Sequence, residues 1–440
     1  MKNKKWMAIL LGGIMAASLA APCSVSAAEK TTLTFWHAMG GTNGEVLQQI
    51  VDDFNASQDE IEIKAEYQGT YDDTITKLKA AMQSDSGLPD VCQMYDVGTK
   101  FMYDSGAVIP VEDKFESTGY DKSSVMDVIS SYYTVEGKQY AMPFNVSTPM
   151  LYYNKDVFEA AGLDPETPPT TYDEVLEDAK KIVESGAAPV GYSQAIYGWF
   201  FEQQLAGLGV TYGNNDNGRT EAVTAVDFDS NGGGLKVFDM WKKLYDSGYF
   251  EDYGTTTADT QTAFFSGQVG MIIESTAILK NAVDSSPFEV GTGYLPRIEQ
   301  NDEGGVIIGG GSLWLTDTGN EANEDAAWKF IEYITTPDVQ AKWSMGTGYF
   351  AINEKAYETD AMKDYLKENP NFETAINQLK DSPVNCNTAG VLSGVQTEAR
   401  LTFNEIMPQV YDGKLTTQDA VDQLAASVNK AIENYNESIK

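Results

Sequence analysis

The first 95 residues alternate between two hydrophobic periods, and this alternation constrains the fold more than any other feature of the chain. Residues 32–36, 61–67 and 91–95 have the pattern of strands, whereas residues 44–54 and 71–82 carry apolar side chains at helical spacing. Successive strands separated by helices are joined by right-handed crossovers, which favours parallel pairing. This part of the chain is therefore predicted to be an α/β unit.

A second ordered signal lies at residues 144–175. It reads as a strand at 150–153, a short helix at 156–161, a Pro-rich turn and a second helix. Gly162 lies directly after the predicted short helix. A helix can end there in a left-handed conformation, which costs less for glycine than for residues with a Cβ. Thr171 and Glu174 have the spacing of a capping box, in which each side chain bonds an amide at the start of the next helix.

The chain of 440 residues is too long for one hydrophobic core, so two lobes are expected. Helices are predicted at 235–245, 258–265 and 322–334, strands at 269–275 and 305–315, and two last helices within 397–439 that break around 412–413. Lobe 1 is predicted to comprise residues 29–142 and about 276–340. Lobe 2 is predicted to comprise residues 143–275 and about 341–440.

The N-terminus has the three parts of a signal peptide, predicted to be residues 1–28. Lys2, Lys4 and Lys5 precede an apolar run at 6–21, and small residues follow at 25–27. The run is short for a membrane span. The mature protein is therefore expected to be exported, to the periplasm or the outer face of the membrane. Cleavage is favoured over a lipid anchor at Cys23, because Pro22 precedes this cysteine where a lipobox has a small residue.

Charge and composition exclude several functions. The net charge of −35 repels nucleic acid and anionic membranes. His37 is the single histidine, which argues against His-based metal sites and Ser/Cys–His catalysis, so no metal, no cofactor and no catalytic residue is predicted. Cys92 and Cys386 are too few for a disulfide framework, and a bond between them is the less favoured alternative.

Several longer motifs resemble a known family. They are TLTFWHAMGG at 32–41, YQGTYDD at 67–73, MYDVGTKFMYDSGAVIPV at 94–111, FNVSTPMLYYNKDVFEAAGLDPETPP at 144–169, GVIIGGGSLWLTD at 305–317 and GTGYFAINEKAY at 346–357. Together they resemble the extracellular solute-binding proteins of ABC importers, and in particular the sn-glycerol-3-phosphate-binding branch. The resemblance implies a two-lobed, type II-like periplasmic-binding-protein fold, with mainly parallel sheets flanked by helices and lobes joined by hinge crossovers. It also implies a monomer that binds a small phosphorylated polyol, without transforming it, and delivers it to the transmembrane subunits of an ABC permease.

The same resemblance implies a set of ligand-binding residues. A phosphate pocket would be formed by Ser147, Ser275, Gly309, Tyr349 and Arg400. The glycerol hydroxyls would contact Tyr71 and Asp96, and Trp199 would form an aromatic wall. Two positions depart from the family pattern: Asp96 stands where the family usually has Glu, and Ile196 stands where an aromatic residue is common. The smaller Ile196 predicts a roomier pocket and a preference for glycerophosphocholine over glycerol-3-phosphate.

The residues themselves support this assignment but leave alternatives. Arg400 is one of three arginines, and its planar fork matches a phosphate. It could instead pair with a carboxylate distant in sequence, since Asn404, one turn on, is uncharged. Gly309 could form a glycine bulge, Trp199 could belong to the core, and Asp96 could cap the helix that begins near residue 98. As a ligand group, Asp96 is expected at the end of the cleft far from the phosphate.

Two other functions compete with this prediction. A binding protein for a neutral sugar or oligosaccharide would use aromatic platforms and carboxylate acceptors. An exported glycosidase would need a pair of carboxylates, which no motif marks among the 65 acidic residues.

Overall fold

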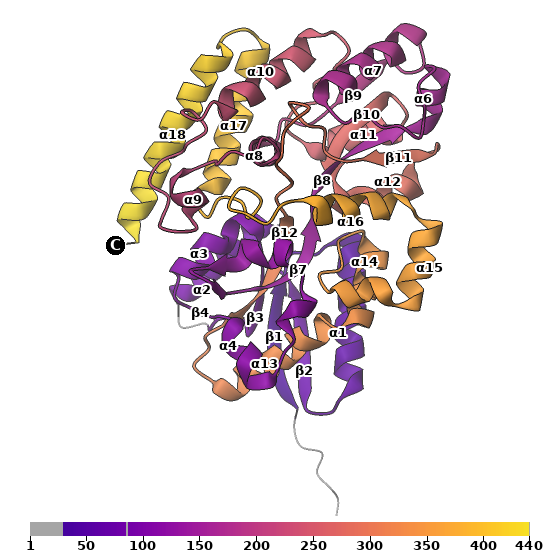
Figure 1. Cartoon of the computed structure of the whole chain (residues 1–440). Helices are drawn as coiled ribbons and strands as arrows, with labels where there is room; N and C mark the ends of the chain where they lie inside the picture. The colour runs from indigo at the N-terminus through magenta and orange to yellow at the C-terminus, as the bar shows by residue number, and fades with distance from the viewer. Residues whose placement is uncertain (1–29, 85–86, 440) are drawn as a thin grey trace, which may run out of the picture.

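The computed structural model describes residues 30–84 and 87–439, which form two lobes (Figure 1). The predicted signal peptide and Cys23 lie outside the described residues. Each lobe has a β-sheet flanked by helices. Two large clusters of buried apolar side chains form the core: one fills the first lobe and continues onto side chains of β8, β10 and β11, and the other lies in the second lobe. The two-lobed α/β prediction is thus confirmed.

The first sheet has the strand order β2–β1–β3–β12–β4, and β7 also pairs with β12. Its strands are β1 (Thr31–His37), β2 (Ile61–Tyr67), β3 (Val91–Tyr95), β4 (Val108–Ile109), β7 (Met142–Ser147) and β12 (Gly309–Thr316). The helices around it include α1 (Gly41–Ser57), α2 (Tyr71–Met82), α3 (Thr99–Asp104), α13 (Glu321–Ile334) and α14 (Pro337–Thr347).

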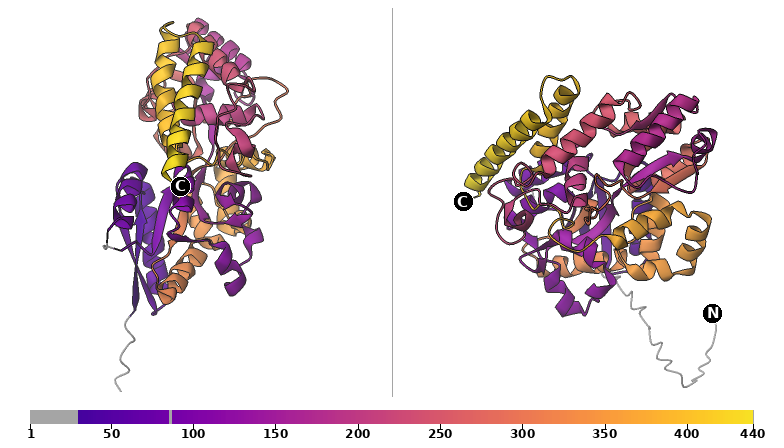
Figure 2. Two further views of the ribbon diagram at one scale, coloured as in Figure 1. Left: turned by 90° about the vertical axis from the view of Figure 1, so that its left-hand side faces the viewer. Right: turned by 45° about the horizontal axis from the view of Figure 1, so that its top comes forward.

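The second sheet has the order β11–β8–β10–β9. Its strands are β8 (Pro149–Asn154), β9 (Val190–Ser193), β10 (Val269–Ser275) and β11 (Val290–Gly293). Helices of this lobe include α6 (Lys155–Ala160), α7 (Tyr172–Ser185), α8 (Gly198–Gly207), α10 (Gly233–Asp246), α11 (Thr257–Phe265), α17 (Gln396–Tyr411) and α18 (Thr417–Ser438). Figure 2 shows α17 and α18 side by side along the edge of the lobe.

The strand directions differ from the predicted mainly parallel sheets. β1 is parallel to β2 and β3, but β12 is antiparallel to β3, β4 and β7. In the second sheet β8 is antiparallel to β10 and β11, and only β9 with β10 is parallel. β12 follows β11 of the second sheet, so no strand–helix–strand crossover joins it to β3 and the rule that favours parallel pairing does not apply to it. Thr148 alone separates β7 from β8, so here too the chain passes between the sheets without a crossover helix.

The sheets also place two segments differently from the predicted lobe boundaries. β12 returns to the first sheet, as predicted for residues 276–340, but β11 within that segment pairs with β8 of the second sheet. α14 extends into the segment assigned to lobe 2, yet it packs against α1 of the first lobe, where Lys342 pairs with Asp53. The chain therefore crosses between lobes more often than its hydrophobic pattern indicates.

Local signals around residues 144–175 are confirmed. Gly162 has a φ of 76°, and Thr171 and Glu174 form both bonds of a capping box at the start of α7. At the crossover between β7 and β8, the Thr148 amide donates to the Thr276 hydroxyl at 3.1 Å, and the Thr148 carbonyl accepts from the Thr276 amide at 2.8 Å. The crossover at Thr148 is thus bonded to the segment that directly follows β10.

Candidate functional site

A cavity of about 490 Å³ lies between the lobes, at the ends of β3, β7, β10 and β12. Seven of the nine predicted ligand-binding residues line it: Tyr71, Asp96, Ser147, Trp199, Ser275, Gly309 and Arg400. Residues from both lobes therefore share one cavity, although they are spread over more than 300 positions of the chain.

The first lobe contributes an aromatic wall built on the start of α2. Thr70 caps this helix with Asp73, which places Tyr71 in its first turn. The Tyr71 ring stacks on Tyr95 with ring centres 5.2 Å apart and planes 9° apart. The Asn145 amide donates to the Tyr71 hydroxyl at 2.7 Å, so the orientation of the ring is fixed from behind.

Arg400 is held by a carboxylate that is distant in sequence. Its Nε and Nη2 donate to the two carboxylate oxygens of Glu202 at 2.8 and 2.7 Å, and Gln396 donates to the same carboxylate at 2.9 Å. Nη2 also lies 3.5 Å from Oδ2 of Asp96, which follows β3 in the first lobe. Burial alone would lower the pKa of Arg400, but Glu202 and Asp96 together raise it well above its usual value. The guanidinium is therefore a fixed, permanently charged group.

Gly198 allows this arrangement because α8 and α17 approach closely there. A Cβ on Gly198 would lie 2.5 Å from the Cα of Arg400. The Gly198 amide donates to the Asn404 side chain at 2.9 Å, which ties the start of α8 to α17. This contact positions Glu202, one turn further along α8, opposite Arg400.

Carboxylates outnumber cations around the cavity. Asp96 and Glu274 line it, Glu202 lies behind Arg400, and each of these side chains is less than a tenth exposed. Glu274 accepts from Gln261 at 3.0 Å and from the Ser275 amide at 2.7 Å, and it has no basic partner among the described residues. Burial raises the pKa of Glu274, while these two hydrogen bonds oppose the rise.

Trp199 and Tyr197 form the aromatic wall of the second lobe. The indole Nε1 of Trp199 is buried and has no hydrogen-bond partner within the described part of the chain. A Cβ on Gly309 would lie 2.7 Å from the Trp199 ring, so this position needs glycine for the indole to lie against β12.

Two predicted residues do not line the cavity. Tyr349 lies behind the first wall, near Tyr71 and Asn145, with its ring stacked on Trp343 at 5.7 Å. Ile196 is completely buried in the core of the second lobe, and Tyr197 next to it faces the cavity instead. The expectation that Ile196 leaves extra space in the pocket is therefore not met.

The position of Asp96 also differs from the expectation. It was predicted at the end of the cleft far from the anion site, yet its carboxylate faces Arg400. Its Oδ1 accepts from the Val97 amide at 2.7 Å in the short turn after β3, and it does not cap α3. Asp96 and Glu202 thus neutralise Arg400 from two sides.

Sequence reasoning missed several lining or supporting residues: Tyr95, Glu202, Thr255, Thr256, Thr257, Glu274 and Gly310. A signal existed for two of them. Glu202 interrupts the apolar run of α8, and Glu274 interrupts that of β10. A carboxylate inside a buried apolar element requires a polar partner or a function, and both residues could have been singled out on this ground.

The described residues lack two kinds of feature. Within 30–84 and 87–439 no cluster of three or more His, Cys, Asp or Glu residues is arranged to hold a metal ion. No helix in this part is long and apolar enough to span a membrane. Cys92 is buried and Cys386 partly exposed, and both are free thiols, so the disfavoured disulfide is not formed.

Comparison with known proteins defines the class. Residues 49–374 match the family of bacterial extracellular solute-binding proteins, and the chain belongs to this family. Proteins of this family bind solutes for transport by ABC importers.

Individual relatives agree with this class. The chain is 31% identical over 417 residues to the sn-glycerol-3-phosphate-binding periplasmic protein UgpB of Escherichia coli K12, covering 93% of this chain and 94% of that protein. The fold is similar to UgpB from Mycobacterium tuberculosis in complex with glycerophosphocholine (TM-score 0.78, 20% identity, 92% of this chain and 99% of that one). It is also similar to a cyclic α-maltosyl-1,6-maltose-binding protein from Arthrobacter globiformis (TM-score 0.77, 26% identity, 92% and 100%).

Proposed function

We propose that this protein binds a glycerophosphodiester, of which glycerophosphocholine is the model, in the cavity between its lobes and delivers it to an ABC permease from outside the cytoplasm. In this proposal the protein acts as a monomer and leaves its ligand chemically unchanged. It binds sn-glycerol-3-phosphate less tightly than the glycerophosphodiester. The sequence similarity to UgpB supports the phosphorylated glycerol part of the ligand.

The observation that carries the proposal is the charge around the cavity. The cavity has one guanidinium and three nearby carboxylates: Asp96 and Glu202 pair with Arg400, and Glu274 lines the same cavity. A phosphomonoester with nearly two negative charges would meet one cation that is already neutralised. A phosphodiester carries one negative charge, and a choline group adds a compensating cation that Glu274 attracts.

The remaining parts of the ligand also find suitable partners. Nη1 of Arg400 makes no hydrogen bond to any described residue, so it can donate to a phosphate oxygen. The hydroxyls of Ser147 and Ser275 are further donors at the cavity. Tyr197 and Trp199 offer aromatic faces to a quaternary ammonium.

A neutral oligosaccharide is the second candidate. The stacked Tyr71–Tyr95 pair and the opposing Tyr197 and Trp199 could sandwich a sugar ring, and Asp96 and Glu274 could accept from its hydroxyls. Such a ligand would gain little from Arg400, which distinguishes it from a phosphodiester.

A thermal-shift panel tests the proposal. Glycerophosphocholine is expected to raise the melting temperature most, sn-glycerol-3-phosphate less, and maltose and inorganic phosphate little. Mass analysis of the recovered ligand is expected to find it unchanged. A larger shift with maltose would favour the oligosaccharide candidate, and a cleaved product would identify an enzyme.

A further inference from the structure

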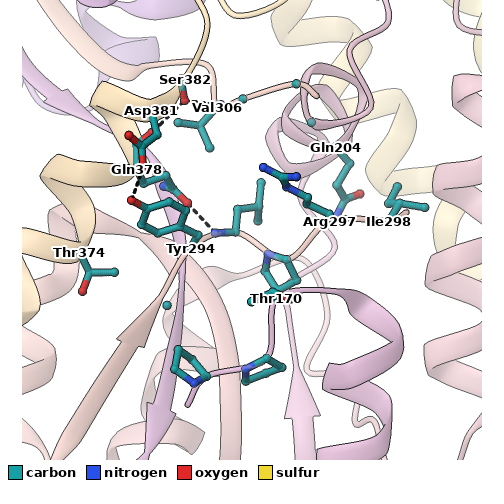
Figure 3. Close-up of a pocket in the computed structure, with 18 of the residues that line it drawn as sticks. Thr170, Gln204, Tyr294, Arg297, Ile298, Val306, Thr374, Gln378, Asp381 and Ser382 are labelled. Carbon is teal, nitrogen blue, oxygen red and sulfur yellow. Dashed lines mark hydrogen bonds between the residues drawn. The ribbon is translucent and has the colours of Figure 1, made fainter. Parts of the chain in front are cut away.

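A second cavity, of about 520 Å³, lies elsewhere in the molecule and shares no lining residue with the cavity between the lobes (Figure 3). One side is formed by the turn before α7, the end of α8 and the connection from β11 toward β12. The other is formed by α16 (Asn371–Asp381) and Ser382. Its volume is in the range of small-molecule sites in proteins.

Hydrogen bonds hold the two sides in place. The Tyr294 hydroxyl donates to Oδ2 of Asp381 at 2.7 Å, and the Val306 amide donates to the Ser382 hydroxyl at 3.1 Å. Gln378 accepts from the Leu295 amide. Three bonds thus connect α16 with the segment that faces it, so the cavity is formed before any ligand arrives.

Arg297 gives this cavity a cationic group. Its backbone is fixed on both sides, since its amide donates to Thr170 and its carbonyl accepts from Tyr172, each at 2.9 Å. Its side chain makes no ion pair with any residue in the described ranges, and Figure 3 shows the guanidinium extending from the wall opposite Asp381. Asp381 is occupied by Tyr294, so the fork of Arg297 is free to bind an external anion.

Apolar side chains also line the cavity that contains Arg297. Pro168, Pro169, Ile298 and Val306 line the same cavity as Arg297. An anion alone would leave this surface in water, whereas a molecule with an apolar body would cover it. The cavity therefore combines one free cation with an apolar wall.

We propose that this cavity is a second ligand site, for a small amphipathic organic anion whose carboxylate, phosphate or sulfonate group pairs with Arg297. The ring or aliphatic body of that ligand lies against the two prolines, Ile298 and Val306. The site does not depend on which solute occupies the cavity between the lobes.

The test uses two fluorescent probes that differ only in an anionic group: 8-anilinonaphthalene-1-sulfonate and its uncharged analogue N-phenyl-1-naphthylamine. Full-length mature protein is titrated with each probe. The sulfonate is expected to bind with an affinity at least about tenfold higher than the analogue, because a charge-assisted pair contributes that much. This preference should vanish in Arg297→Gln.

Two controls make the result specific. Lys180→Gln removes an exposed cation on α7, outside the cavity, and should leave probe binding unchanged. Saturating glycerophosphocholine should not displace the sulfonate. Absence of sulfonate binding, equal binding by Arg297→Gln, or displacement by glycerophosphocholine would each overturn the proposal. The first two results do not bear on the ligand of the other cavity, whereas displacement would mean that the probe and glycerophosphocholine share a site.

Discussion

Arg400 is the cationic side chain of the cavity between the lobes. Its planar guanidinium and the uncharged residue one helical turn away, Asn404, indicated a functional role. Arg400 does line the cavity. Its partner Glu202 lies 198 positions away, and only the packing of α8 on α17 brings the two together. Sequence spacing carries no information about such a pair.

Replacement of Arg400 by lysine tests this residue. Lys retains the charge but lacks the fork that satisfies both Glu202 oxygens, so affinity for a phosphodiester should fall by about 2–4 kcal/mol. Isothermal titration calorimetry measures the change in affinity. Gln396→Glu is not a suitable control, because Gln396 also donates a hydrogen bond to Glu202. Lys430→Arg, on the exposed face of α18, is the matched control. Unchanged affinity in Arg400→Lys would remove Arg400 from the site.

His37 makes stability depend on pH. It is buried, and burial lowers its pKa to about 4 from 6.5. Above pH 6.5 both folded and unfolded states hold it neutral. As the pH falls toward 4, only the unfolded state takes up the proton, so up to about 3 kcal/mol of stability is lost.

The His37→Gln variant separates this effect from that of the buried carboxylates. Their raised pKa values favour the folded state as the pH falls, which is opposite to the effect of His37. Urea unfolding at pH 7 and pH 4.5 should show that the wild type loses about 2 kcal/mol more than the variant. Equal losses would mean that His37 is accessible to protons in the folded protein.

Elements were predicted better than their pairing. Helix positions along the chain, the glycine stop at Gly162 and the capping box at Thr171 depend on neighbours in sequence, and they are confirmed. The direction of each strand and the lobe to which β11 and α14 belong depend on partners distant in sequence. For these features the prediction was wrong. The candidate site shows the same division: family motifs indicated its lining, but not Glu202, Glu274 or the burial of Ile196.

The contact between α8 and α17 gives a prediction at the scale of elements. Gly198→Ala would place a methyl group 2.5 Å from the Arg400 Cα, so the helices must separate. We expect a loss of about 1–3 kcal/mol in stability and weaker ligand binding. Gly207→Ala, at the other end of α8, meets no atom within 4 Å and should be neutral or slightly stabilising. If both variants unfold alike, the close approach at Gly198 is not important.

At the scale of the whole molecule, the lobes touch through groups outside the cavity as well as inside it. The Tyr435 hydroxyl on α18 donates to Asp104 of α3 at 2.6 Å, and the Tyr95 and Thr397 hydroxyls are 2.7 Å apart. These contacts join the lobes in the described conformation. They break if the lobes rotate apart about the crossovers at Thr148 and between β11 and β12.

Ligand binding is therefore expected to favour the conformation in which the lobes touch. Small-angle X-ray scattering should show a smaller radius of gyration at saturating ligand than without ligand, since a ligand that contacts both lobes stabilises their closed arrangement. An identical scattering profile in both states would argue for a rigid cavity.

The proposed ligand preference depends on the surplus of carboxylates over Arg400 in the cavity. Calorimetric titration of the wild type and Glu274→Gln with glycerophosphocholine and sn-glycerol-3-phosphate measures that dependence. We predict that the wild type binds glycerophosphocholine more tightly, and that Glu274→Gln weakens glycerophosphocholine and strengthens sn-glycerol-3-phosphate. A wild type that prefers sn-glycerol-3-phosphate, or a preference that Glu274→Gln leaves unchanged, would show that these carboxylates do not select the ligand.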